Sequence, residues 1–140
     1  MRMRLALALV ALFLAACNGP KEKCEGSFKS YFSMIEGQDF AGMYEMLTPK
    51  FKKKVKSVEH FSAAMLEQWN GTYGFSKKVD SITESADGIC IARGAMSYTW
   101  RVRGKEAEAH DDEFFSWTFR KERDGKWYIE LPGYERISGY

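Results

Sequence analysis

Three side chains in the second half of the chain have the types that proton-transfer chemistry uses. Asp111 and Glu113 lie in the stretch "EAEAHDDE", and Tyr98 precedes them in the chain. A carboxylate in an apolar environment has a raised pKa and can act as a general base, and a tyrosine hydroxyl can donate to a developing oxyanion. These three are candidate catalytic residues of an isomerase- or dehydratase-type enzyme. The alternative interpretation, which we favour, is a solvated hairpin rim without catalytic function.

One predicted β-hairpin would bring these residues together. The segments 89–103 and 106–121 are rich in β-branched and aromatic residues and flank Gly104-Lys105. A two-residue turn with glycine at its first position suits a type II′ hairpin. His110 would then lie on the outer face, beside Thr99. The register predicts the pairs Cys90–Phe119, Ala92–Trp117, Gly94–Phe115, Met96–Glu113, Tyr98–Asp111, Trp100–Ala109, Arg101–Glu108 and Arg103–Glu106.

Side-chain size supports this register and distinguishes the two faces of the sheet. Small residues on one strand oppose large ones on the other, and a slip of one residue would exchange the faces. Phe114 falls on the outer face, which is a candidate homodimer surface. The residues expected to contact a ligand on the inner face and the adjoining helix are Tyr31, Met96, Tyr98, Trp100, Phe115 and Trp117. A turn at "RDGK", with Gly125 left-handed, would pair Phe119 with Ile129 and Trp117 with Leu131.

The first half of the mature chain has helical spacing. Apolar residues recur at intervals of three and four over 28–35, 40–47 and 58–69, and a short helix is expected after Pro49. Gly37 ends the first of these helices. The expected N-caps are Asp39, Thr48 and Ser57. Strands are expected near 75–85, 89–103, 106–121 and 126–137. Helices followed by an antiparallel sheet define an α+β class.

Two stretches resemble the nuclear-transport-factor-2-like family. They are "SYFSMIEGQDFAGMYEMLTPKFK", residues 30–52, and "FSWTFRKERDGKWYI", residues 115–129. The resemblance spans about residues 24–137. It implies a cone, in which N-terminal helices pack on a curved four-stranded antiparallel sheet with a pocket at the open end. The family includes isomerases, dehydratases, cyclases and non-catalytic binding modules, and a fold alone does not choose among them. We expect the cone to bind a small apolar ligand or a partner protein without catalysis, and the alternative is the isomerase- or dehydratase-type enzyme.

The N-terminus predicts export and lipidation. Arg2 and Arg4 precede 12 apolar residues, Leu5–Ala16. This run is too short for a transmembrane helix, which needs about 20 apolar residues, and is typical of a signal peptide. The following "LAAC" resembles the bacterial lipobox, which implies cleavage before Cys17 and lipidation of its thiol; the alternative is an ordinary signal peptide. The predicted organisation is a leader (1–16), a lipidated tether (17–23) and one α+β domain (24–140). If the cell is Gram-negative, the resemblance implies the periplasmic side, and Asn18 in place of an inner-membrane-retaining aspartate favours the outer membrane.

Cysteine usage after this cleavage predicts a disulfide. Cys24 and Cys90 remain, and the exported compartment is oxidising. Two buried free thiols are the alternative. The sequence has two histidines, His60 and His110, and no metal-ligand spacing, so we expect neither a metal nor another cofactor.

The charge of the mature chain argues against nucleic acid as a partner. Loss of Arg2 and Arg4 lowers Lys+Arg from 21 to 19, which equals Asp+Glu. One local cluster stands out in "KFKKKVK". Lysines on a helix face are usually only solvated, but these are also candidates for contact with an anionic envelope surface. They are Lys50, Lys52, Lys53, Lys54 and Lys56.

Overall fold

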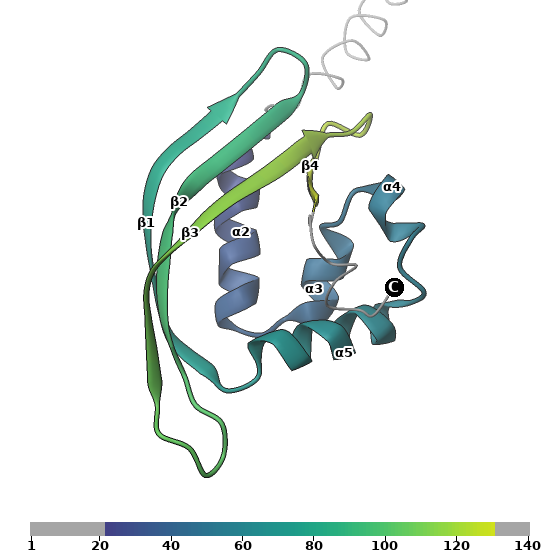
Figure 1. Ribbon diagram of the computed structural model, residues 1–140. Coiled ribbons are helices and arrows are strands. Elements are labelled where there is room, and N and C mark those ends of the chain that lie inside the picture. The colour runs from purple at the N-terminus through teal and green to yellow at the C-terminus, as the bar shows by residue number, and fades with distance from the viewer. Residues whose placement is uncertain (1–21, 131–140) are drawn as a thin grey trace, which may run out of the picture.

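A computed structural model describes residues 22–130, in which helices come first and strands follow (Figure 1). The leader, Cys17, most of the tether and Leu131 lie outside the described residues. Within residues 22–130, no helix has the length and apolar character needed to cross a membrane. The elements are α2 (Cys24–Glu36), α3 (Phe40–Glu45), α4 (Pro49–Lys52), α5 (Val58–Trp69), β1 (Thr72–Glu84), β2 (Ile89–Trp100), β3 (Glu108–Lys121) and β4 (Trp127–Glu130).

The helices begin where the capping residues predict. The Asp39 carboxylate accepts from the backbone N–H of Gly42 at 2.9 Å, and the Ser57 hydroxyl accepts from that of His60 at 3.1 Å. Thr48 caps α4, with Pro49 as its first residue. Proline suits that position because its missing N–H would have no partner within the helix. These local bonds set the short connections that bend the chain back between helices.

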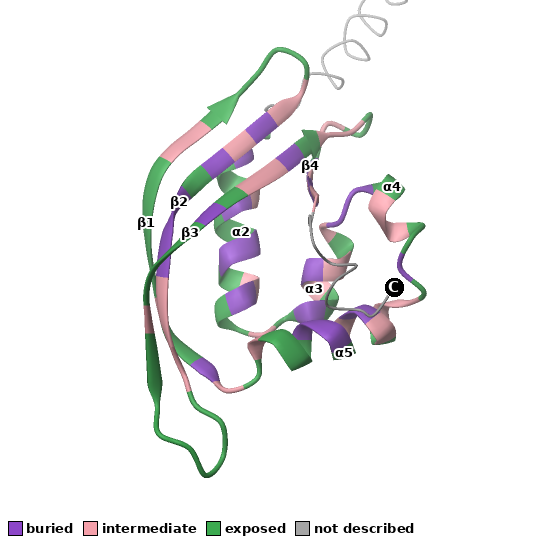
Figure 2. Ribbon diagram, viewed as in Figure 1, coloured by how far each residue is buried: buried purple, intermediate pink, exposed green. Residues whose placement is uncertain are grey.

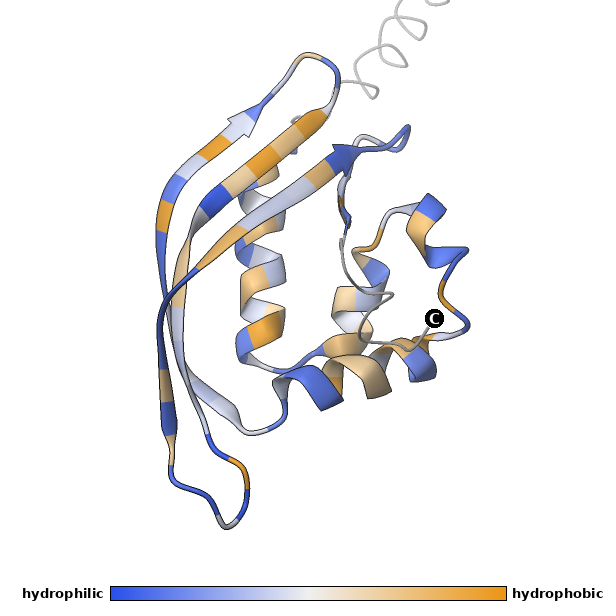
Figure 3. Ribbon diagram, viewed as in Figure 1, coloured by the Kyte–Doolittle hydropathy of each residue, from blue (hydrophilic) through white to orange (hydrophobic). Residues whose placement is uncertain are grey.

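The four strands form one antiparallel sheet in the order β1-β2-β3-β4, and its concave side faces α2 (Figure 1). The buried residues of β2 lie within Cys90–Met96, those of β3 are Phe115 and Phe119, and those of α2 form a stripe (Figure 2). The same stripe is largely apolar (Figure 3). The predicted α+β class is therefore confirmed. Phe114 is 87% exposed, on the opposite face from Phe115, as the alternation predicts.

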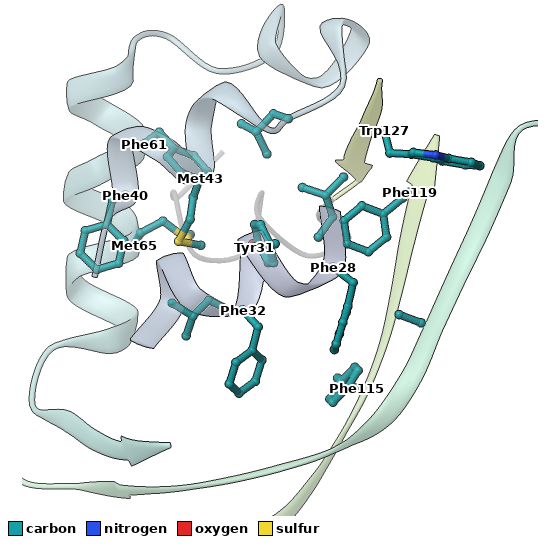
Figure 4. Close-up of a cluster of buried hydrophobic side chains, with 14 of the residues drawn as sticks. Phe28, Tyr31, Phe32, Phe40, Met43, Phe61, Met65, Phe115, Phe119 and Trp127 are labelled. Atoms are coloured by element: carbon teal, nitrogen blue, oxygen red, sulfur yellow. The ribbon is translucent and has the colours of Figure 1, made fainter. Parts of the chain in front are cut away.

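Aromatic side chains fill the space between α2 and the sheet (Figure 4). The ring of Phe28 lies 5.8 Å from that of Phe115, and Tyr31 meets Trp117 edge-on at 5.2 Å. Phe119 is fully buried, whereas Trp117 is only half-buried. The predicted packing of this face of the sheet against α2 is thus confirmed. Trp117 is less buried than predicted and lies at the edge of the core. A second group of buried side chains joins α3 to α5 (Figure 4).

The predicted disulfide is present and ties the start of α2 to the second strand. Cys24 and Cys90 are bonded, with Cα atoms 6.4 Å apart, and both residues are fully buried. The backbone N–H of Cys24 also donates to the Glu84 carboxylate at 2.7 Å. In the chain-entropy model, a link between residues 66 apart stabilises the fold by about 4 kcal/mol.

The β2–β3 register matches the prediction from Cys90 to Met96, but the prediction is wrong from Tyr98 to the end of β2. Pairs from Cys90–Phe119 to Met96–Glu113 are those expected. Then β3 contains one extra residue, so that Tyr98 pairs with His110 instead of Asp111, and Trp100 pairs with Glu108 instead of Ala109. The cause is a β-bulge in which Asp112 has φ 54° and its N–H donates to the Ser97 hydroxyl at 3.1 Å.

The end of the hairpin also differs from the prediction. The strands stop at Trp100 and start again at Glu108, so residues 101–107 form a loop. The expected strand pairs of Arg101 with Glu108 and Arg103 with Glu106 are therefore absent from the ladder. The turn bond runs from the N–H of Lys105 to the carbonyl of Val102 at 3.0 Å, which places left-handed Gly104 third in the turn. The following turn has Gly125 left-handed and pairs Phe119 with Ile129, as predicted.

Candidate functional site

A small pocket lies at the open end of the sheet, beside the 101–107 loop. Its volume is about 240 Å³. This is below the range of about 300–1,000 Å³ typical of drug-sized ligands, so it suits a single ring or a short chain. It is built by the end of α5, the first residue of β1 and the paired ends of β2 and β3. Its lining residues are Gln68, Thr72, Tyr98, Trp100, Glu108 and His110.

His110 enters this pocket because of the bulge. Two residues of β3, Asp111 and Asp112, oppose Ser97 alone, and this turns His110 to the inner face. Its ring stacks on that of Tyr98, with centroids 4.9 Å apart and planes 10° apart. The bulge therefore changes the chemistry of the site, because an imidazole occupies the position predicted for the carboxylate of Asp111.

Two glutamates flank the imidazole. His110 Nδ1 lies 3.4 Å from a carboxylate oxygen of Glu113, and Nε2 lies 3.7 Å from one of Glu108. The side chain of His110 is 28% exposed, whereas those of Glu113 and Glu108 are 53% and 63% exposed. The imidazole is therefore the most sheltered of these three side chains.

Tyr98 and Trp100 form an aromatic wall of the pocket, and neighbouring residues fix both side chains. Tyr98 contacts Trp69 and Phe75, with ring centroids 5.8 Å and 5.6 Å away. The Trp100 indole N–H donates to the backbone carbonyl of Asn70 at 3.0 Å. Burial, together with the negative charges of Glu113 and Glu108, raises the pKa of Tyr98 above its ordinary value. Tyr98 thus keeps its proton at neutral pH and can donate a hydrogen bond.

The predicted catalytic carboxylates do not lie in an apolar mouth. Asp111 is exposed in the bulge, and Glu113 is exposed beside His110. Tyr98 is the one member of the predicted trio that lines the pocket. His110 and Glu108 were expected elsewhere in the hairpin. A signal for the bulge exists in "HDDE", because aspartate tolerates left-handed backbone better than most residues, but it does not specify where the extra residue falls.

The six residues expected to contact a ligand divide into two groups. Tyr98 and Trp100 line the pocket. Tyr31, Met96 and Phe115 are buried in the core, and Trp117 packs against them. The space that the predicted cone would leave open near α2 is thus filled by the protein's own side chains. The space that remains accessible is the pocket lined by Tyr98 and Trp100 at the open end of the sheet.

A larger groove lies along a different face of α2, with a volume of about 640 Å³. Met34 and Met46 are the apolar side chains among its lining residues, and the others are glycine, serine or charged. It offers no aromatic wall among the residues that line it. Residues 22–130 also contain no group of three or more His, Cys, Asp or Glu side chains arranged to hold a metal ion.

Comparisons with known proteins show the fold. No family model matches the chain, and no curated protein matches its sequence. A ketosteroid isomerase-like protein from Erwinia carotovora atroseptica SCRI1043 superposes with a TM-score of 0.55 at 12% identity, over 75% of this chain and 86% of the other. A version of Rd1NTF2_05 with five substitutions superposes with a TM-score of 0.50 at 16% identity, over 76% of this chain and 91% of the other. The chain therefore has the nuclear-transport-factor-2-like α+β fold.

Proposed function

We propose that this protein is an exported lipoprotein, anchored through Cys17, that binds a small and largely apolar ligand in the pocket at the open end of its sheet. The observation that carries the proposal is the supported aromatic wall formed by Tyr98 and Trp100. Both side chains are half-buried, and both line the pocket. The gain from covering such a surface is about 25 cal/mol per Å² of apolar area.

The polar residues of the pocket would orient a bound ligand, whereas the apolar wall would supply most of the binding free energy. The Thr72 hydroxyl donates to the Trp69 carbonyl at 2.5 Å, so its oxygen remains an acceptor for a ligand. Gln68 offers an amide, and Glu108 offers a carboxylate at the rim. A few convergent polar groups beside an apolar wall are typical of ligand sites.

Binding without catalysis is favoured by where the carboxylates lie. A carboxylate base at neutral pH needs an apolar environment to raise its pKa. Asp111 and Glu113 are exposed instead, and aromatic side chains fill the interior near α2. The envelope location is supported by the basic leader, the short apolar run and "LAAC", and by the disulfide, which suits an oxidising compartment.

The second candidate is an isomerase- or dehydratase-type enzyme that uses the same pocket. One observation favours it: His110 is largely sheltered, contacts two glutamates and stacks on a tyrosine that keeps its proton. In that case His110 would be the base and Tyr98 the hydrogen-bond donor. A protein with a similar fold is named ketosteroid isomerase-like, but at 12% identity this likeness extends to the fold alone.

The test is ligand binding measured with uncharged ring compounds, for which indole and naphthalene serve as probes. We expect saturation-transfer NMR to detect binding, and Trp100→Ala to weaken it at least tenfold. Phe114→Ala is the matched control, because it removes an exposed aromatic side chain from the other face. Equal binding by the Trp100→Ala variant would refute the proposed pocket. Turnover of an enolisable ketone that disappears in His110→Ala would favour the enzyme instead.

A further inference from the structure

The α4 segment carries a concentrated positive charge that the ligand pocket does not use. We define the lysine segment as residues 50–56. It contains five lysines, and no acidic residue occurs between Glu45 and Glu59. Lys50, Lys53, Lys54 and Lys56 are exposed. The fifth, Lys52, is held within the protein by the Glu45 carboxylate at 2.9 Å and by the ring of Tyr44.

The lysine segment is rigidly attached to the domain. Val55 is buried and Phe51 is half-buried against the core. The buried Thr48 begins α4, and its backbone N–H donates to the carbonyl of Ile129 in β4 at 3.1 Å. The exposed lysines therefore project from a fixed surface, and their orientation follows that of the whole domain.

This surface lies near the point where the chain enters the domain. The Trp127 indole N–H donates to the backbone carbonyl of Glu22 at 3.0 Å, and Trp127 and Ile129 belong to the same short strand. Both Glu22 and Thr48 thus contact β4. Cys17 lies five positions before Glu22, and a fully extended chain of that length spans at most about 18 Å. A bilayer that holds a lipid on Cys17 would then lie within about 18 Å of Glu22, which contacts the same strand as the start of α4.

The ligand pocket lies at the other end of α5. Lys56 comes just before the first turn of this helix, and Gln68 of the pocket lies in its last turn. A helix of 12 residues is about 18 Å long. Figure 1 shows the same separation, with α4 far from the loop that joins β2 to β3.

We infer that the lysine segment contacts anionic phospholipid headgroups of the membrane that carries the lipid anchor. This contact turns the pocket away from the bilayer. The inference rests on the proposed anchor at Cys17, which brings the headgroups within reach. Clustered lysines next to a membrane attachment point are attracted by a negative surface potential, and each one changes partitioning about fivefold. Lipid and lysines together then supply two independent membrane signals.

The test maps lysine accessibility on the full lipidated protein reconstituted in vesicles. One vesicle set contains phosphatidylcholine alone, and the other contains 30% phosphatidylglycerol. After treatment with an acetylating reagent, mass spectrometry reports the extent of reaction at each lysine. We expect Lys50 and Lys53 to react at least threefold more slowly on the anionic vesicles, and 0.5 M NaCl to remove this protection. Lys105, in the loop beside the pocket, should react equally on both.

Variants separate this contact from the anchor. In the unmodified protein we expect Lys54 and Lys56 to be protected on anionic vesicles as well. Lys50→Glu/Lys53→Glu should abolish this protection, whereas the matched control Lys78→Glu/Lys105→Glu should retain it. Equal reaction of Lys50 and Lys53 on both vesicle types, or equal protection of Lys105, would overturn the inference. If the protein fails to float with neutral vesicles, the anchor proposal is wrong. Salt-sensitive flotation with anionic vesicles, lost in Lys50→Glu/Lys53→Glu, would then still support the lysine contact, and its absence would refute it.

Discussion

His110 stacks face to face on Tyr98 across the β2–β3 hairpin, with ring centroids 4.9 Å apart. This contact depends on the bulge, because an uninterrupted ladder would place Asp111 opposite Tyr98. One extra residue in a strand thus decides which side chain faces the ligand pocket. Bulges often re-aim side chains next to functional sites in this way.

The bulge itself can be tested at Asp112, whose φ is 54°. A β-branched residue is strained in left-handed backbone, so Asp112→Ile should lower the free energy of unfolding by about 1–2 kcal/mol. Asp112→Gly should be tolerated. Urea denaturation measures both. The matched control is Asp111→Ile at the exposed neighbouring position, and an equal loss in that variant would contradict the assignment of strain to Asp112.

Two aromatic residues of β3 can test which face of the sheet is buried. Trp117 packs against Phe28, Tyr31 and Phe115, so Trp117→Ala should lower the free energy of unfolding by about 3 kcal/mol, the low end for a large aromatic because this one is half-buried. Phe114→Ala should cost less than about 0.5 kcal/mol, since Phe114 is 87% exposed. Equilibrium denaturation of both variants checks the difference. A greater loss in Phe114→Ala would mean that the outer face is covered, for example by a second copy.

At Gly94 the backbone of β2 lies close to that of β1 and to the Phe115 ring. A Cβ atom there would lie 2.2 Å from the Lys78 carbonyl oxygen and 2.9 Å from the Phe115 ring. Gly94→Ala should therefore lower the free energy of unfolding by at least about 2 kcal/mol, through overpacking. Gly26→Ala is the opposite case, because Gly26 lies in α2 and an added Cβ would have no atom within 4 Å apart from the neighbouring residues and nearby backbone of its own helix. It should raise the free energy of unfolding by about 0.5–1 kcal/mol. A thermally stable Gly94→Ala variant would contradict the packing described.

Buried Tyr31 should make the protein sensitive to alkaline pH. Burial raises the pKa of its hydroxyl above the ordinary value of about 10. Above pH 10 the unfolded chain therefore binds fewer protons than the folded one, and the free energy of unfolding falls as pH rises. Each such tyrosine contributes up to about 1.4 kcal/mol per pH unit. Tyr31→Phe should flatten the decline between pH 10 and 11.5, and exposed Tyr73→Phe is the control. An unchanged slope in Tyr31→Phe would show that other groups cause the decline.

The lipid anchor is tested at Cys17. Cys17→Ser should leave an uncleaved precursor or release the protein from membranes, because the thiol is the predicted site of acylation. Membrane fractionation with metabolic labelling by a radioactive fatty acid would show this. Cys24→Ser is the control, since it removes a cysteine that forms the disulfide. Mature, lipid-labelled Cys17→Ser protein in the membrane fraction would disprove the anchor.

Local features of the sequence sufficed to predict most of the fold. Capping side chains such as Asp39 and Ser57 bond to backbone only three residues away, so a helix start depends on a few neighbouring residues. The register of Cys90 with Phe119 follows from alternation and from small residues facing large ones, both visible in the two strands alone. The disulfide was predicted from the number of cysteines and from the expected oxidising compartment, and the structure contains it.

The tertiary structure decided what the pocket contains. The choice between a continuous ladder and a bulge depends on the Ser97 hydroxyl, which meets the Asp112 backbone only after the strands have paired. Whether an open cavity remains between α2 and the sheet depends on how Tyr31 of α2 packs with Phe115 of β3. The periodicity of the sequence does not specify this packing. Secondary structure arises from short-range patterns, whereas this site depends on one inserted residue and on contacts between segments distant in the chain. That is why the sequence alone predicted a cone with acidic residues at its mouth, and the folded protein has an imidazole on an aromatic wall.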